Sequence, residues 1–138
     1  MIHLPFATLQ AALHLRLTTD WPTMKVFTLP PTVNEALPYV IINSFSAGEI
    51  NPQWEVTVGI DVYSQTAGNT EVNLLCGNVL KSISGDELDL TLGGFQHEET
   101  FLDSVQTAIE SGDERGPVQH GTIRMRMVVS DIAGGSWS

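Results

Sequence analysis

Cations, cysteines and long apolar runs are all scarce in this chain of 138 residues. Six Lys and Arg stand against sixteen Asp and Glu, which gives a formal net charge of −10. An acidic surface repels phosphate groups, so stable binding of nucleic acid is not expected. Two interpretations of the charge stay open: it keeps the protein soluble, or it forms a wall past which nucleic acid slides without sticking.

The single cysteine, Cys76, rules out an intramolecular disulfide and a cysteine-based zinc site. It lies among apolar residues at helical spacing, so we expect a small buried core residue rather than a nucleophile. The first residues carry neither a basic start nor a long apolar segment, and no window reaches about 18 apolar residues. We therefore expect neither an export signal nor a membrane span.

The sequence does contain enough apolar material for a core, because 42% of its residues are hydrophobic, among them three Trp and five Phe. Its length fits one domain. No internal repeat or low-complexity block divides it. We predict one domain over residues 1–132, followed by a flexible tail at 133–138 that is rich in Gly and Ser and carries Trp137.

Two helices are predicted from apolar residues spaced three and four apart. The first covers about residues 4–18, with Pro5 in its first turn. The second begins near Asn69, a suitable N-cap, and ends at Gly85. Their apolar faces are formed by Phe6, Leu9, Leu13 and Leu17, and by Val72, Leu75, Cys76, Val79, Leu80 and Ile83.

Strands are predicted where β-branched and apolar residues recur with period two. Residues 39–42 are apolar on both faces, which favours a central strand buried on both sides. Residues 54–62 alternate apolar and polar side chains strictly. Between the two segments, Ala47-Gly48 and Asn51-Pro52 are turn signals, so we expect an antiparallel hairpin. A short extended segment at 26–29 precedes Pro30-Pro31.

The segment 95–109 fits a helical face and also an alternating set, and we interpret it as a strand. Residues 122–128 alternate cleanly. Since a polar loop at 111–116 lies between them, a hairpin with a long loop is the economical arrangement. Together these elements predict the α+β class.

The sequence contains no recognisable metal-binding or catalytic motif. His97-Glu98-Glu99 has Phe101 where the helical zinc motif needs a second His, so we expect solvated polar residues there. The other histidines are scattered, and the cluster at 86–89 fits no calcium-loop spacing.

No serine lies in a Gly-x-Ser-x-Gly elbow, and the Gly-rich spots lack the Gly-Lys-Ser/Thr end of a phosphate loop. We predict no catalytic residue, no cofactor and no metal, and therefore a protein that is not an enzyme.

The order of elements resembles a known family. A helix and a short extended segment are followed by the strands LPYVII at 37–42 and VGIDVYS at 58–64, by a helix opening soon after Gly68, and by HGTIRMR at 120–126. In this order and character the chain is similar to the tail-completion and tail-terminator (head-tail joining) proteins of long-tailed phages. The resemblance spans nearly the whole chain, except for Pro30-Pro31 and the tail with Trp137.

The resemblance implies a mainly antiparallel twisted sheet with two helices packed on it. It implies a structural virion protein, made in the host cytoplasm, that forms a homohexamer ring in the neck, caps the tail tube and joins it to the head connector. The tail tube protein and the head-tail connector protein are the implied partners, and the genome would pass through the lumen without specific binding.

Partner contacts are expected at polar loops that become ordered on assembly, at 65–69, at 113–116 and in the C-terminal tail. Asp113, Glu114, Arg115 and Trp137 are the predicted interface residues. Two alternatives stay open: another phage neck, baseplate or tail-tube-like component, or a small enzyme or ligand-binding domain with an apolar pocket.

Overall fold

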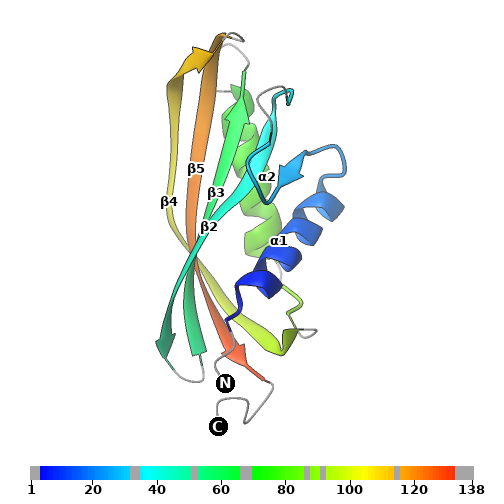
Figure 1. Cartoon of the computed structure of the whole chain (residues 1–138), viewed down its shortest axis with the longest axis vertical. Helices are drawn as coiled ribbons and strands as arrows, with labels where there is room; N and C mark the ends of the chain where they lie inside the picture. Colours follow the sequence, from blue (N-terminus) through cyan, green and yellow to red (C-terminus); the bar gives the residue numbers. More distant parts are fainter. Residues whose placement is uncertain are drawn as a thin grey trace.

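The protein is built of two layers, a twisted sheet and two helices that cover one of its faces (Figure 1). The computed structural model describes residues 4–31, 35–50, 53–65, 70–85, 88–90, 93–113 and 116–132. Within them the chain forms α1 (Phe6–Asp20), β1 (Val26–Phe27), β2 (Tyr39–Ile50), β3 (Gln53–Ser64), α2 (Thr70–Gly85), β4 (Phe95–Asp113) and β5 (Gly116–Asp131).

The strands of the described chain lie in the order β1-β2-β3-β5-β4. The two-residue strand β1 pairs with β2 in parallel, and all other neighbours are antiparallel. The sheet is strongly twisted along its length (Figure 1). This confirms the α+β class with a mainly antiparallel twisted sheet and two helices packed on it, and it resolves the segment 95–109 as a strand.

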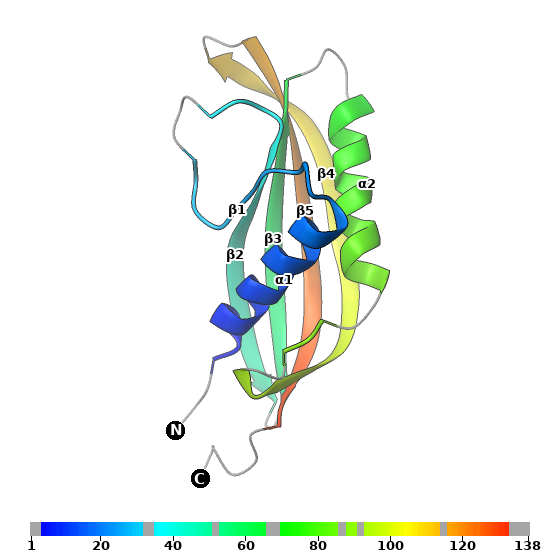
Figure 2. The same cartoon turned by 90° about the vertical axis from the view of Figure 1, so that its right-hand side faces the viewer.

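Both helices pack on the same face of the sheet (Figure 2). The side chains of Leu9, Leu13 and Leu17 are fully buried, as the predicted stripe requires. On α2 the buried positions include Val72, Cys76 and Val79. Because each large aliphatic side chain contributes about 1.5–3 kcal/mol when buried, these stripes are sufficient to hold the helices on the sheet.

The core lies between the helices and the inward side chains of the two central strands, β3 and β5. Alternate residues of β3 are buried, as predicted from their sequence pattern, and the register of the strands places each opposite a buried residue of β5. The inward residues are Trp54, Val56, Val58, Ile60 and Val62 on β3, and Ile123, Met125, Met127 and Val129 on β5.

Side chains of helix α2 pack directly against Gly121 of β5. A Cβ atom at this position would lie 2.5 Å from Cys76 Sγ and 3.3 Å from a methyl group of Val72. Glycine is therefore favoured here by the packing of the helix rather than by a turn. Cys76 is buried, as predicted, and burial raises the pKa of its thiol above the ordinary value.

Two predicted connections were wrong. Ala47-Gly48 is not a turn, because β2 continues to Ile50, which pairs with Gln53. The loop predicted at 111–116 is shorter, because β4 extends to Asp113 and Asp113 pairs with Gly116. In both places the small and polar residues favour turns by themselves. They are nevertheless part of a strand, because their backbone pairs with a long neighbouring strand.

Strand β2 is buried on both faces at residues 40–42, as predicted. It lies second from the edge, since only β1 lies outside it. The N-cap expected at Asn69 and the tail at 133–138 lie outside the described residues. No helix among the described residues is long and apolar enough to cross a membrane.

Candidate functional site

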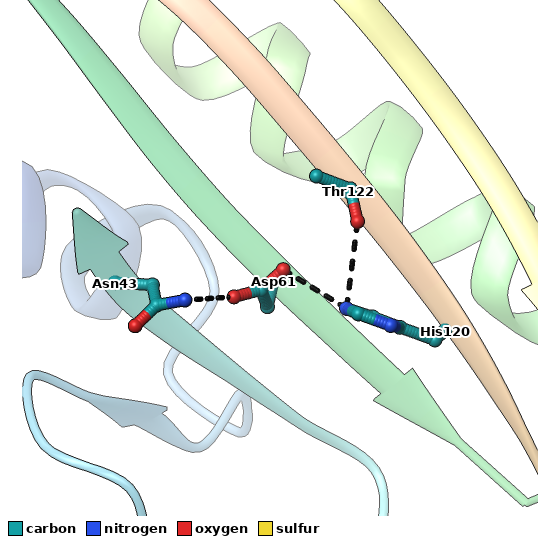
Figure 3. A network of polar contacts seen from close by, with 4 residues as sticks. All are labelled: Asn43, Asp61, His120 and Thr122. Carbon is teal, nitrogen blue, oxygen red and sulfur yellow. Dashed lines mark hydrogen bonds and ion pairs between the residues drawn. The ribbon is translucent and has the colours of Figure 1, made fainter. Parts of the chain in front are cut away.

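The face of the sheet opposite the helices carries a connected network of polar side chains (Figure 3). Asp61 of β3 is 8% exposed and accepts a hydrogen bond from the side-chain amide of Asn43. Its other carboxylate oxygen lies 2.9 Å from His120 Nε2 of β5. Thr122 Oγ1 lies 3.5 Å from the same nitrogen. Strand alternation places all four side chains on this open face.

Aromatic rings extend this network across the sheet. The imidazole of His120 stacks on the ring of Tyr63, with ring centroids 4.4 Å apart and planes 9° from parallel. Tyr63 in turn contacts Tyr39, and Tyr39 meets Phe27 edge to face at 5.8 Å. These contacts join β1, β2, β3 and β5, so they fix the register of strands at one end of the open face.

The network does not have the geometry of a nucleophilic triad. A triad needs an acid on one imidazole nitrogen and the nucleophile on the other, so that the ring can relay a proton. Here Asp61 and Thr122 both approach Nε2 of His120. The arrangement orients the ring and links two strands, but it does not activate the threonine.

A second polar group lies further along β5. Arg126 donates hydrogen bonds to Asp103 of β4 at 2.8 Å and to Glu55 of β3 at 3.4 Å. The bond to Asp103, followed by that to Glu55, raises the pKa of Arg126. Its guanidinium also lies 5.4 Å from the ring centre of Phe101. These contacts tie three strands together and hold the charge of Arg126 between carboxylates.

His97 departs from the expectation of solvated polar residues. It is 5% exposed, and its Nδ1 accepts a hydrogen bond from the backbone N–H of Leu88 at 3.1 Å. Its Nε2 lies 2.7 Å from Thr100 Oγ1. Because β4 turns this side chain inward opposite Val129, the imidazole satisfies a loop amide inside the fold. No group of three metal-ligating side chains occurs among the described residues.

The predicted interface residues lie at the margin of the described chain. Asp113 is the last residue of β4, and its backbone pairs with Gly116. Glu114, Arg115 and Trp137 lie outside the described residues. The structure therefore does not bring these four together, and their role as an interface stays a prediction.

A pocket of about 270 Å³ lies between the residues that follow α1, strand β2 and helix α2. Its lining includes the apolar residues Trp21, Met24, Pro38 and Leu75 and the polar residues Thr23, Lys25 and Asn78. Typical ligand pockets measure about 300–1,000 Å³ and hold several converging polar groups. Lys25, the charged side chain at this pocket, is engaged with Glu35 at 3.1 Å. The pocket therefore offers little specific support for a ligand-binding domain.

Asp61→Ala is expected to lower the free energy of unfolding by about 1–3 kcal/mol, because it leaves Asn43 and His120 without their shared acceptor in a largely buried place. Urea denaturation measures the loss. Asp61→Asn, which keeps a hydrogen-bonding side chain of the same shape, should lose clearly less. A loss of less than about 0.5 kcal/mol for Asp61→Ala would mean that the network contributes little to stability.

Comparison with known proteins gives the family. The family model described as "Tail completion protein gp17" matches residues 10–130. None of the curated proteins matches the chain. Among solved structures, a chain of the "Virion of native gene transfer agent (GTA) particle" is similar with a TM-score of 0.69 and 15% identity. The match covers 94% of this chain and 99% of the other, and at that identity it shows a shared fold.

Because the family model spans most of the sequence, from α1 through β5, the chain belongs to the tail completion protein gp17 family and is a structural protein of a phage tail.

Proposed function

We propose that the chain is a tail-terminator subunit, and that six copies close into a ring at the end of the tail tube and join it to the head connector. Membership of the tail completion family carries this proposal. The tail tube protein and the head-tail connector protein are the partners. The protein acts in the neck of the virion of a long-tailed phage, after synthesis in the host cytoplasm, and its work is binding rather than catalysis.

The acidic composition has a use in such a ring. Each copy adds a formal charge of −10, and adhesion to phosphate needs Lys or Arg. A ring of these chains repels the genome as it passes through the lumen, so the genome moves without specific binding. A lumen lined mainly by basic side chains would contradict this part of the proposal.

The mass of the purified protein by light scattering, followed by negative-stain imaging of the same sample, tests the ring. Six-subunit rings of uniform diameter are expected, either in solution or on purified tails. Stacked tubes would instead favour a tail-tube-like component. A chain that remains monomeric and is absent from purified tails would overturn the proposal.

Attachment is tested separately from ring formation. Deletion of residues 133–138, which removes Trp137, should leave the thermal unfolding of the protein unchanged and weaken the joining of heads to tails in a complementation assay. Charge reversal of Asp113, Glu114 and Arg115 tests the other predicted contact. If joining is unchanged in both variants, these residues are not the attachment surface.

A further inference from the structure

The outer edge of β4 is the longest unpaired edge of the sheet. β4 spans 19 residues and is the last strand in the order, so one side of its backbone has no neighbour among the described residues. Figure 1 shows it along the rim of the sheet. A free edge of this kind is a template for another strand, and proteins that avoid pairing protect it with charges, bulges or prolines.

Most of β4 carries such protection, but one segment does not. Bulges interrupt the pairing near residues 98, 103 and 111–112, and the acidic residues Glu98, Glu99, Asp103 and Glu110 lie in the same regions. Residues 104–109, here called the β4 segment, pair with β5 without interruption and contain no charged residue. The edge is therefore open to pairing at this segment.

Apolar side chains in the β4 segment and just before it are exposed. Ile109 is 69% exposed, Leu102 is 53% exposed and Val105 is 37% exposed. Their partners in the register are inward residues of β5, so they lie on the helix-bearing side of the sheet, beyond the helices. Exposed large apolar residues gathered on one edge strand indicate a surface that another molecule covers.

A second free edge lies on the opposite side of the sheet. β1 pairs only with Val40 and Ile41 of β2, so from residue 42 onward the outer side of β2 has no strand partner among the described residues. Residues 43–48, here called the β2 segment, contain no charge, and Asn43, Ser44, Ser46 and Gly48 are exposed. The molecule thus has one uncharged, unpaired segment at each side of its sheet.

The direction of the strands makes the two edges complementary. β2 and β4 run antiparallel to each other, because three antiparallel pairings separate them. A second copy rotated about an axis inclined to the strands therefore brings its β2 antiparallel to β4 and continues the alternation. In the register of the sheet the β2 segment lies level with β5 residues up to Val128, and the β4 segment lies level with residues 119–124 of β5. The second copy is therefore also displaced by about four residues along the strands, as an inclined axis provides. The contact joins two different surfaces, which is the head-to-tail type that a closed ring requires.

Electrostatics also favours a second copy at these segments. Two chains of formal charge −10 repel each other over most of their surfaces. Contact is least unfavourable where acidic side chains are missing, and both segments meet that condition.

We propose that the β4 segment of one copy pairs antiparallel with the β2 segment of the next, so that the sheets of neighbouring subunits are continuous. This inference rests on the proposed ring and names the contact that builds it.

A pair of matched variants tests the contact. Ile109→Lys places a charge on the β4 segment, whereas Leu74→Lys makes the same change at a position on α2 that is 62% exposed. Ile109→Lys should raise the protein concentration needed for half-maximal association by about tenfold or more, since it removes the burial of one aliphatic side chain. Leu74→Lys should leave that concentration nearly unchanged. Both variants reduce the net negative charge equally, so a difference in association between them shows that position 109 lies in the contact between subunits.

Cross-linking tests the pairing directly. Cysteines are placed on the open face at Ser46 of β2 and, in separate variants, at Ser104, Gln106 or Ala108 of β4; Cys76 stays buried. Antiparallel pairing brings the Cα atoms of one combination within the roughly 4.4–6.8 Å span of a disulfide. Oxidation should then give a ladder of linked subunits that ends at the ring. Cysteines at Ser46 and at Lys81 of α2 serve as the control and should give none.

The outcomes separate the two proposals. Rings with the ladder and with weakened association of Ile109→Lys support both. Rings that form equally with Ile109→Lys and Leu74→Lys, and without a ladder in any combination, overturn the edge pairing and leave the ring proposal standing. A wild-type chain that neither associates in solution nor occurs on purified tails overturns the ring, and the pairing with it.

Discussion

Leu13→Ala is expected to lower the free energy of unfolding by about 2–5 kcal/mol. Leu13 lies at the middle of the buried stripe of α1 and is 0% exposed. Its truncation removes apolar contacts from both α1 and the sheet and leaves a cavity that the packed strands cannot fill. Equilibrium denaturation in urea, monitored by tryptophan fluorescence, measures the change. The midpoint should fall while the dependence of the free energy of unfolding on urea concentration stays the same.

The neighbouring leucine provides the control. Leu15 lies on the same helix two residues later and is 66% exposed. Leu15→Ala should change the free energy of unfolding by no more than about 0.5 kcal/mol. Both variants have the same change in helix propensity, so the difference between them isolates the packing of α1 on the sheet. A similar loss in both would mean that α1 is not docked along the face formed by Leu9, Leu13 and Leu17.

Gly121→Ala is expected to destabilise the protein by about 1–3 kcal/mol through overpacking between β5 and α2. The new methyl group would lie 2.5 Å from Cys76 Sγ, so the thiol must rotate, or the helix or the strand must move. Cys76→Ala removes the clashing atom. In the double variant, Gly121→Ala should therefore be tolerated much better, with a coupling of about 1 kcal/mol or more between the two sites.

Gly48 is the control position for the substitution of Gly121. It also lies in a strand, but nothing comes within 4 Å of a Cβ atom built there. Gly48→Ala should change stability by less than about 1 kcal/mol, since alanine restricts the unfolded chain and meets no obstacle in the folded one. The four variants are compared by thermal and urea denaturation. Purely additive effects of Gly121→Ala and Cys76→Ala would show that α2 does not approach the sheet at Gly121.

The helices and the central strands could be predicted because each has one buried face. A buried face imposes a period on the sequence, as in the stripe of α1 or the alternation on β3, and that period is visible without a structure. The same principle favoured the strand interpretation of residues 95–109, where charged Asp103 spoils the alternation. The structure explains that exception, because a bulge between Leu102 and Ser104 shifts the register there.

The ends of the strands could not be predicted in the same way. Ala47-Gly48 and the residues near 111 favour turns locally, yet β2 and β4 continue through them because a neighbouring strand supplies backbone partners. His97 was misjudged for a related reason. Its role depends on the amide of Leu88, a loop residue whose position no sequence pattern fixes. The network of Asn43, Asp61 and His120 joins three strands and was missed for the same reason.

The class of the protein could be read from its residues alone: an acidic α+β chain with two helices and a mainly antiparallel sheet, without a catalytic motif, and similar in its order of elements to the tail completion family. These properties follow from the composition of the chain and from the regular spacing of apolar residues along each helix and strand. The three-dimensional fold was needed to show which strand edges stay free, where α2 touches β5 at Gly121 and which polar groups meet on the open face. Those features depend on contacts between residues far apart in the chain, and local sequence preferences do not specify such contacts.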